Sequence, residues 1–352
     1  MSDLVPFLKD LLSAPGLSGY EIPVRQIIEQ KWLPLADELK VSRMGSLEAL
    51  KRGSGAEPRP KVMLAAHMDA IGMIVNEVVD GFLSFNQIGG VDRRVLPGTP
   101  VTVHGRRDLP GEVVQPPDFL APPESAGKPI RMENLWVDVG LLPGEVSELV
   151  RPGDTISYAT QPVELSGETL AGHTLDNRAS VAAVTHCLEI LQSRIFKCDV
   201  YAVATVQEET VFGGGYTSTY GIQPDVGIAI DVTHAKGPGT SEAHIATLGK
   251  GLALGLGPNI HPFLYRAFKK IADEQEIPYM IDPSASHSGT DAYPMQVAAA
   301  GRPSMVISIP LRYMHTPVEL VSLKDIRRTG RLLADFITRL DREFVESITW
   351  EE

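Results

Sequence analysis

Two histidines and five carboxylates follow predicted strands or open a predicted helix. In an open α/β sheet, ligands bind beyond the carboxyl ends of the strands. Residues that are far apart in the sequence but follow neighbouring strands therefore meet at one edge of the sheet. We expect the following side chains to form one site: His67, Asp69, Asp176, Glu208, Glu209, Asp231 and His315.

This set of side chains fits hydrolysis by water that a divalent cation activates. A bound cation lowers the pKa of water to about 7, and two cations about 3.5–4 Å apart can also stabilise a tetrahedral intermediate. Imidazole and carboxylate groups are suitable ligands, and one carboxylate can bridge two ions. The reaction also needs a carboxylate that is not a ligand and acts as general base and acid. Glu208 and Glu209 could divide these tasks, because neighbouring side chains diverge in an extended loop.

Each residue taken alone has a simpler structural explanation. A single histidine at a strand end, such as His67, is commonly a hydrogen-bonded core residue. Asp176 is well suited to cap a helix N-terminus, and the pair Glu208-Glu209 is suited to solvent. Only their coincidence in one sheet topology favours a site. The other histidines carry no functional signal on sequence grounds: His104, His173, His186, His234, His244, His261 and His287.

Hydrophobic periodicity predicts helices and strands that alternate along most of the chain. Apolar side chains recur at helical spacing in several segments, and short apolar runs indicate buried strands. Such alternation is typical of an α/β domain with a mostly parallel sheet flanked by helices. The predicted helices cover residues 4–12, 21–32, 178–195, 262–276, 290–300 and 323–346, and the predicted strands cover 61–66, 200–206, 226–230 and 305–309.

The segment from about residue 71 to residue 168 has a different character. Short strand-like runs alternate with Gly and Pro, and helical periodicity is almost absent. We interpret this segment as a small all-β insertion in the α/β domain. The expected domains are a catalytic domain formed by 1–70 and 168–352, and a β-rich insertion over 71–167. Within the insertion, residues 115–129 are rich in Pro, Ala and Gly and are predicted to form a loop.

The composition excludes several classes of protein. The chain has 352 residues, 43% of them hydrophobic and 22% charged, as is usual for a soluble globular protein. A net charge of −12 disfavours nucleic acid and anionic membranes as partners. Two cysteines are too few for a thiolate zinc site or a disulfide framework, so His and carboxylates must hold any metal. The first residues lack the pattern of a signal peptide, and we expect a cytoplasmic protein.

Five segments in order along the chain resemble the family of tetrahedral, dodecameric metallo-aminopeptidases. This family includes glutamyl, leucyl and lysyl aminopeptidases, and some members have been catalogued as endoglucanases. Each segment is weak evidence alone, but the ordered set is specific and spans nearly the whole chain. The segments are Ala14-Pro15-Gly16-Leu17-Ser18-Gly19-Tyr20-Glu21, Ala66-His67-Met68-Asp69, Gly172-His173-Thr174-Leu175-Asp176-Asn177-Arg178, Val206-Gln207-Glu208-Glu209 and Ser308-Ile309-Pro310-Leu311-Arg312-Tyr313-Met314-His315-Thr316-Pro317.

The resemblance implies a role for each site residue. His67, Asp176 and Asp231 would hold one cation, and Asp176, Glu209 and His315 would hold the other, with Asp176 bridging. Glu208 would be the general base, and Asp69 would orient the ring of His67. The two cations would be Zn²⁺ or Co²⁺.

The resemblance also implies an architecture and an assembly. The insertion would be a PDZ-like β domain that serves in oligomerisation. Twelve chains, built from dimers, would enclose active sites that face an inner cavity and accept short peptides. By resemblance to related two-metal hydrolases we predict a cis peptide bond between Asp176 and Asn177.

The sequence departs from the usual family pattern near some of these motifs. His173 stands where Lys is frequent, Asn177 where Asp is frequent, and residues 210–214 and 287–288 also differ. None of these departures removes a proposed ligand, so they affect the expected specificity rather than the expected catalysis. His287 is the additional residue of most interest.

Three other functions remain as alternatives. In a glycosidase, Glu208 and Glu209 would supply the two carboxylates, but such groups lie about 5–10 Å apart across the sugar, and 6% aromatic residues is low for a sugar-binding cleft. A scaffold protein with structural metals would have closed metal sites. A deacylase or carboxypeptidase on the same fold would use the same ligands.

Overall fold

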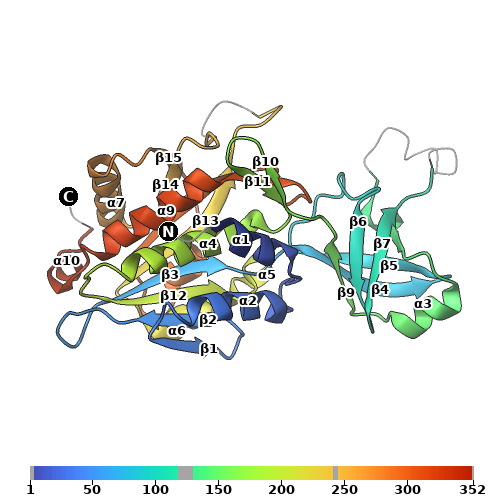
Figure 1. The fold of residues 1–352 in the computed structure, drawn as a ribbon, viewed down its shortest axis with the longest axis horizontal. Coiled ribbons are helices and arrows are strands. Elements are labelled where there is room, and N and C mark those ends of the chain that lie inside the picture. Colours follow the sequence, from blue (N-terminus) through green and yellow to red (C-terminus); the bar gives the residue numbers. More distant parts are fainter. Residues whose placement is uncertain (1–3, 118–129, 241–244, 351–352) are drawn as a thin grey trace.

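The computed structural model describes residues 4–117, 130–240 and 245–350, which form a large lobe and a small lobe (Figure 1). Each lobe has its own cluster of buried apolar side chains. The cluster of the small lobe runs from Ile71 to Tyr158 and is formed by this one segment of the chain. Part of the loop predicted over 115–129 falls outside the described residues. None of the helices in the described residues is long and apolar enough to cross a membrane.

An eleven-stranded sheet forms the centre of the large lobe. Its middle strands β12, β3, β13 and β16 run parallel, whereas the outer strands on both sides are antiparallel. The sheet is therefore mixed, and the expectation of a mostly parallel sheet holds only for its centre. Along the main path the strands are β1 (Glu38–Val41), β2 (Leu47–Lys51), β12 (Asp199–Thr205), β3 (Lys61–His67), β13 (Val226–His234), β16 (Ser304–Arg312), β17 (Glu319–Ser322), β11 (Thr169–Gly172) and β10 (Val163–Leu165), with β14 (Leu252–Leu256) and β15 (Tyr279–Pro283) branching from β16.

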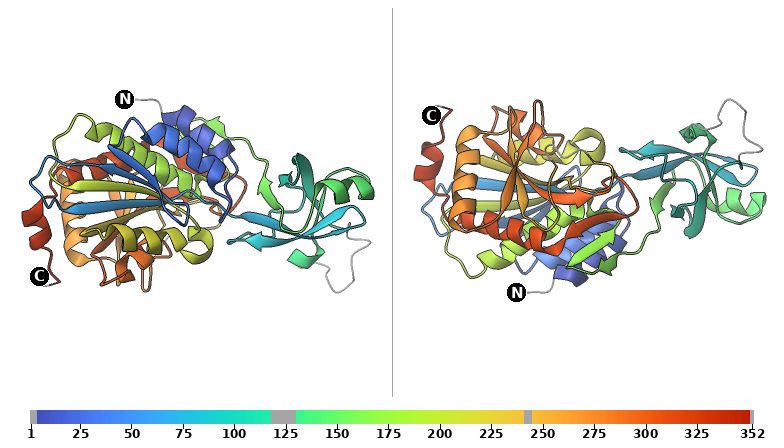
Figure 2. Two further views of the ribbon diagram at one scale, coloured as in Figure 1. Left: turned by 90° about the horizontal axis from the view of Figure 1, so that it is seen from below. Right: turned by 90° about the horizontal axis from the view of Figure 1, so that it is seen from above.

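Helices cover both faces of this sheet (Figure 2). On one face α4 packs against β3 and β13 and is flanked by α1 and α9, of which α9 also contacts β16. On the other face α6 contacts β12 and β3, and α8 contacts β13 and β16. The helices of the large lobe are α1 (Leu4–Ser13), α2 (Ile22–Trp32), α4 (Leu175–Leu191), α5 (Glu208–Val211), α6 (Gly213–Ile222), α7 (Pro262–Glu274), α8 (Ala292–Val297), α9 (Leu323–Ile337) and α10 (Arg342–Glu346).

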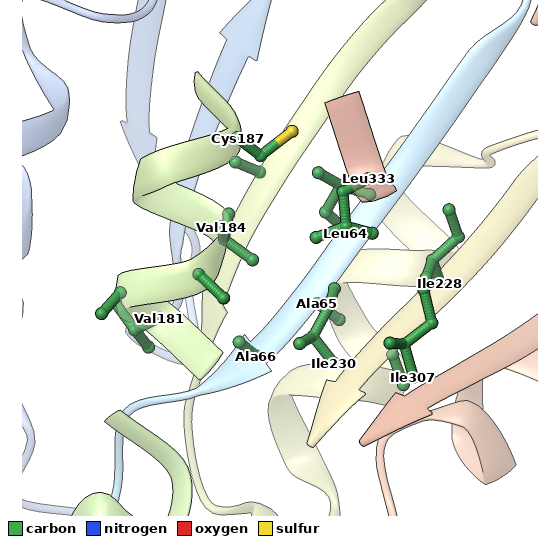
Figure 3. Packing of buried hydrophobic residues seen from close by; sticks show 14 of the residues in the cluster. Leu64, Ala65, Ala66, Val181, Val184, Cys187, Ile228, Ile230, Ile307 and Leu333 are labelled. Atoms are coloured by element: carbon green, nitrogen blue, oxygen red, sulfur yellow. The ribbon is translucent and has the colours of Figure 1, made fainter. Parts of the chain in front are cut away.

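The packing of α4 on the sheet explains why its sequence is so apolar. Val184 and Cys187 of α4 point toward β3, which carries Leu64 and Ala66, and Val181 lies on the same helix (Figure 3). All five side chains are at most 1% exposed. Burial of apolar surface on this scale is the main contribution to the stability of a domain. This packing holds the carboxyl end of β3, which carries His67, against the start of α4, which carries Asp176.

The small lobe is a closed barrel of six strands, inserted between β3 and β10 of the large lobe. The predicted strand character is confirmed, but the α-helix α3 (Pro143–Leu149) and the short 3-10 helix η2 (Met132–Asn134) interrupt the expected all-β pattern. Pro143 begins α3, and Glu145 accepts a hydrogen bond from the amide of Leu142. In order around the barrel, the strands are β4 (Gly72–Val79), β5 (Phe82–Ile88), β8 (Trp136–Asp138), β7 (Asp108–Val114), β6 (Pro100–His104) and β9 (Thr155–Tyr158).

The prediction of one continuous helix over 323–346 is wrong, because this segment forms two helices, α9 and α10. Asp341 adopts an extended conformation between them and accepts a hydrogen bond from the amide of Phe344. Such a cap satisfies a backbone donor at a helix start, so it favours a new helix over continuation of the old one. The helix predicted over 290–300 is shorter and covers only Ala292–Val297.

Candidate metal centre

The predicted site residues come together beyond the carboxyl ends of the parallel strands. His67 is the last residue of β3, and Glu208 and Glu209 follow β12. His315 follows β16 by a short turn. Asp231 was expected just after its strand but lies within β13, which is longer than predicted because it pairs with β16 as far as His234.

One cluster of potential ligands surrounds His67. Its Nε2 atom lies 3.2 Å from Asp176 Oδ1 and 3.7 Å from Glu208 Oε2. The same nitrogen lies 3.9 Å from Asp231 Oδ1. All four side chains are less than a tenth exposed.

A second cluster surrounds His315. Its Nε2 atom lies 3.3 Å from Asp176 Oδ2 and 3.4 Å from Glu209 Oε2. The two oxygens of Asp176 therefore face two different histidines, one in each cluster. This is the arrangement that a carboxylate needs to bridge two cations.

Asp69 faces away from the clusters and supports them. Its two oxygens accept hydrogen bonds from the backbone amides of Glu208 and Glu209, at 3.0 and 3.2 Å. Oδ1 also lies 3.5 Å from Nδ1 of His67, and Ser18 donates a hydrogen bond to Oδ2. Asp69 thus fixes both the ring of His67 and the turn that carries the two glutamates.

Glu208 and Glu209 begin the short helix α5 rather than an extended loop, so the expected local conformation was wrong. Gln207 precedes them with φ of 56°, a left-handed conformation that is unusual for a residue other than glycine. The two side chains still diverge as expected. Glu208 approaches His67, whereas Glu209 approaches His315.

The peptide bond between Asp176 and Asn177 is cis, as predicted. The side-chain amide of Asn177 donates a hydrogen bond of 2.9 Å to the carbonyl of Ile230, the residue before Asp231. Next in sequence, the buried Arg178 donates to the carbonyls of Leu11 and Ala14. These contacts link the start of α4 to β13 and to the end of α1.

Two buried carboxylates that the sequence did not single out also belong to this region. Glu319 accepts hydrogen bonds from the backbone amides of Asp176, at 3.1 Å, and His315, at 2.9 Å. Asp291 accepts a hydrogen bond from Thr205, and its negative charge contributes to raising the pKa of the buried Glu208. Glu319 follows His315 by only four residues and Asp291 lies three residues after the variant positions 287–288, but neither ends a predicted strand.

The crowding of carboxylates changes their protonation. Burial, with the nearby charge of Asp176, raises the pKa of Glu209 to about 8. Burial raises the pKa of Asp231 to about 8 and that of Glu208 well above its ordinary value. For Asp176, burial opposes ionisation, but hydrogen bonds from His315 and His67 outweigh it and lower the pKa. The hydrogen bond to Asp176 raises the pKa of His315 to about 9.

The residues present fit two divalent cations. Nitrogen and oxygen atoms of His67, Glu208 and Asp231 lie within 4.8 Å of one another, and so do those of His67, Asp176 and Glu209. These sets share His67 and differ from the predicted ligand sets in including Glu208 and in leaving out His315. Buried carboxylates that repel one another are stabilised by a cation, and oxygen with imidazole nitrogen is the donor set that zinc and cobalt accept.

Metal-free protein is expected to lose stability as the pH rises from about 5 to about 9. The folded-state pKa values of Glu209, Asp231 and His315 all lie above their ordinary values. The folded state therefore binds these protons more tightly than the unfolded state does, and the advantage disappears as the pH passes the folded pKa values. The thermal unfolding midpoint of chelator-treated protein measures this trend. An Asp231→Asn variant should show a weaker decline, and a midpoint that rises over this window would contradict the argument.

The remaining sequence expectations concern residues outside the clusters. His173 is buried, and burial lowers its pKa to about 3, so it stays neutral. His287 is exposed, with its ring 5.1 Å from that of Tyr293. The ring centroid of Tyr293 also lies 6.3 Å from that of Phe212, one of the residues that depart from the family pattern. In the described part of the chain, His287 has no hydrogen bond or ion pair with the clusters. Both cysteines are buried free thiols.

Comparison with known proteins supports the resemblance inferred from the motifs. The model of the M42 glutamyl aminopeptidase family matches residues 45–332. Lysyl aminopeptidase of Pyrococcus furiosus is 36% identical over 341 residues, which are 95% of this chain and 96% of that protein.

Solved structures give the same result. The TET aminopeptidase of the marine sediment archaeon Thaumarchaeota archaeon SCGC AB-539-E09 has a TM-score of 0.93 and 30% identity, over 98% of this chain and 99% of that one. The TET1 peptidase of Pyrococcus horikoshii, described as able to assemble into a tetrahedron or a large octahedral shell, has a TM-score of 0.84 and 27% identity, over 96% and 100% of the two chains. The chain belongs to the M42 glutamyl aminopeptidase family.

Proposed function

We propose that this chain is a metal-dependent aminopeptidase that uses two divalent cations, Zn²⁺ or Co²⁺, to remove amino-terminal residues from short peptides. The observation that carries the proposal is the position of Asp176, whose two oxygens lie 3.2 and 3.3 Å from the Nε2 atoms of His67 and His315. Asp231 would complete the ligands of one cation and Glu209 those of the other.

Glu208 is proposed as the general base and acid. Bound cations would lower the pKa of the attacking water and polarise the scissile carbonyl. Glu208 would take the proton of that water and return it to the leaving amine. Its burial raises its pKa, which suits a group that must both accept and release a proton near neutral pH. Asp69 holds the amides of Glu208 and Glu209 and so keeps the base separate from the ligand.

The assembly is proposed from the relatives. The ability of the P. horikoshii peptidase to form a tetrahedron supports a tetrahedral dodecamer here. The barrel lobe would be the oligomerisation domain, with the boundaries 71–167 and the PDZ-like character expected from the sequence. Enclosed active sites would admit only short peptides. The cytoplasmic location stays a prediction.

Activity on aminoacyl substrates is expected to depend fully on metal. Purified protein would be assayed against a panel of aminoacyl-p-nitroanilides before chelation, after chelation, and after addition of zinc or cobalt. We expect turnover that falls to background with the chelator and returns with the cation, because water is a poor nucleophile unless a cation lowers its pKa. The panel also identifies the preferred residue. Turnover of acylated amino acids or cellulose-like oligosaccharides alone, with metal bound, would instead support the deacylase or glycosidase.

A further inference from the structure

The barrel lobe reaches into the metal centre through the loop that joins β5 to β6. The carbonyl oxygen of Gly90, in this loop, lies 3.0 Å from Nδ1 of His315. A carbonyl oxygen can only accept a hydrogen bond, so Nδ1 must carry the proton. The other nitrogen, Nε2, is the atom that faces Asp176 and Glu209. The loop thus selects the tautomer of His315 in which Nε2 can act as a ligand.

Two glycines allow this loop to come so close. A Cβ atom on Gly90 would lie 2.7 Å from Nδ1 and 3.0 Å from Cε1 of His315, which is closer than real Cβ contacts allow. A Cβ atom on Gly89 would lie 3.4 Å from Cβ of Glu209. The loop therefore contacts His315 and passes close to Glu209, the two residues that, with Asp176, make up the second cluster.

The first cluster is supported differently. His67 makes its hydrogen bond with the carbonyl of Asp69, and Asp231 accepts one from the amide of Val232. These partners belong to the large lobe. In the described residues, the barrel supplies a hydrogen-bond partner to the imidazole of the second cluster and to no imidazole of the first.

We propose that Gly90 is a positioning residue for one of the two cations, so that the barrel lobe controls the affinity of the second site and leaves the first unchanged. The inference rests on the proposed two-cation function and assigns the loop a role within that site. A partner that orients a ligating histidine is typically worth about 10–100-fold in metal affinity. Loss of the Gly90 contact should therefore weaken one site by this factor and convert the protein to a form with a single tightly bound ion.

The test compares Gly90→Ala with a matched glycine in the same lobe. Gly144 lies in α3, and a Cβ atom built there meets nothing within 4 Å, so Gly144→Ala is the control. Chelator-treated proteins would be titrated with Co²⁺, followed by calorimetry and by the visible absorbance of the ion. We expect the wild type and Gly144→Ala to bind two ions. Gly90→Ala should bind one ion normally and the other about 10–100-fold more weakly.

A second variant covers the case in which Gly90→Ala does not fold. Asp92 closes the same loop by accepting hydrogen bonds from the backbone and side chain of Arg94, and Asp92→Ala loosens it without adding atoms near His315. It should weaken the same site by a smaller factor. Unchanged affinities in the folded variants, or an equal loss at both sites, would overturn the role of the loop. Uptake of fewer than two ions by the wild type would instead contradict the two-cation function.

Discussion

Replacement of Glu208 by glutamine is expected to lower kcat by about 10²–10⁴-fold while both cations remain bound, because general acid–base catalysis contributes a factor of this size. Glutamine has nearly the same volume and can still donate and accept hydrogen bonds, but it cannot take a proton from water. Glu208 is 7% exposed, so bulk water cannot easily replace it. Measurement of kcat and KM on the preferred aminoacyl-p-nitroanilide, together with metal content, tests this expectation.

Thr210→Ala is the matched control for this variant. Thr210 lies in the same short helix as Glu208, and its side chain is exposed. It should leave kcat nearly unchanged. If Glu208→Gln instead kept its kcat and lost one cation, Glu208 would be a ligand. This result would agree with the short distances between the potential ligand atoms of His67, Glu208 and Asp231.

Replacement of Asp176 by asparagine is expected to weaken both cation sites and to reduce activity by about 10³-fold or more, because the attacking water loses its activation. Asp176 is the residue whose oxygens face both histidines. An amide has one neutral oxygen in place of two that share a negative charge. Elemental analysis after dialysis against low metal would measure the loss of both ions.

Asp273→Asn provides the control for the loss of a negative charge. Asp273 is about half exposed and pairs with Lys269 on the surface of α7. It should bind two cations and retain activity. Selective loss of a single ion from the Asp176 variant would contradict the bridging role and would assign Asp176 to one cluster.

Much of the large lobe could be predicted because its signals are local. Apolar periodicity located α1, α2, α4 and α7 to within a few residues. The buried central strands appeared as apolar runs, since both faces of a parallel strand are covered. Placing His67 and His315 together required only that the parallel strands of one sheet, here β3 and β16 on either side of β13, end at the same edge. These parts of the site follow from pattern and topology.

Other parts depend on tertiary contacts that leave no local signal. The short strands β10, β11 and β17 at one side of the sheet have few residues and form through pairing with distant segments. Glu319 resembles any loop acid in the sequence, and its role comes from joining the nearby amide of His315 to the amide of Asp176, which lies far away in the sequence. The contact of Gly90 with His315 joins two lobes, so no periodicity could indicate it.

The wide spacing of the clustered residues along the chain has a consequence for synthesis on the ribosome. His67 is made 248 residues before His315 (315 minus 67). At about 5–20 residues per second, this interval lasts roughly 12–50 s. During that time the barrel can fold, since its core comes from one continuous segment, but the imidazole that its loop must orient does not yet exist. A nascent chain therefore cannot hydrolyse peptides, and the active form arises only after the C-terminal strands join the sheet.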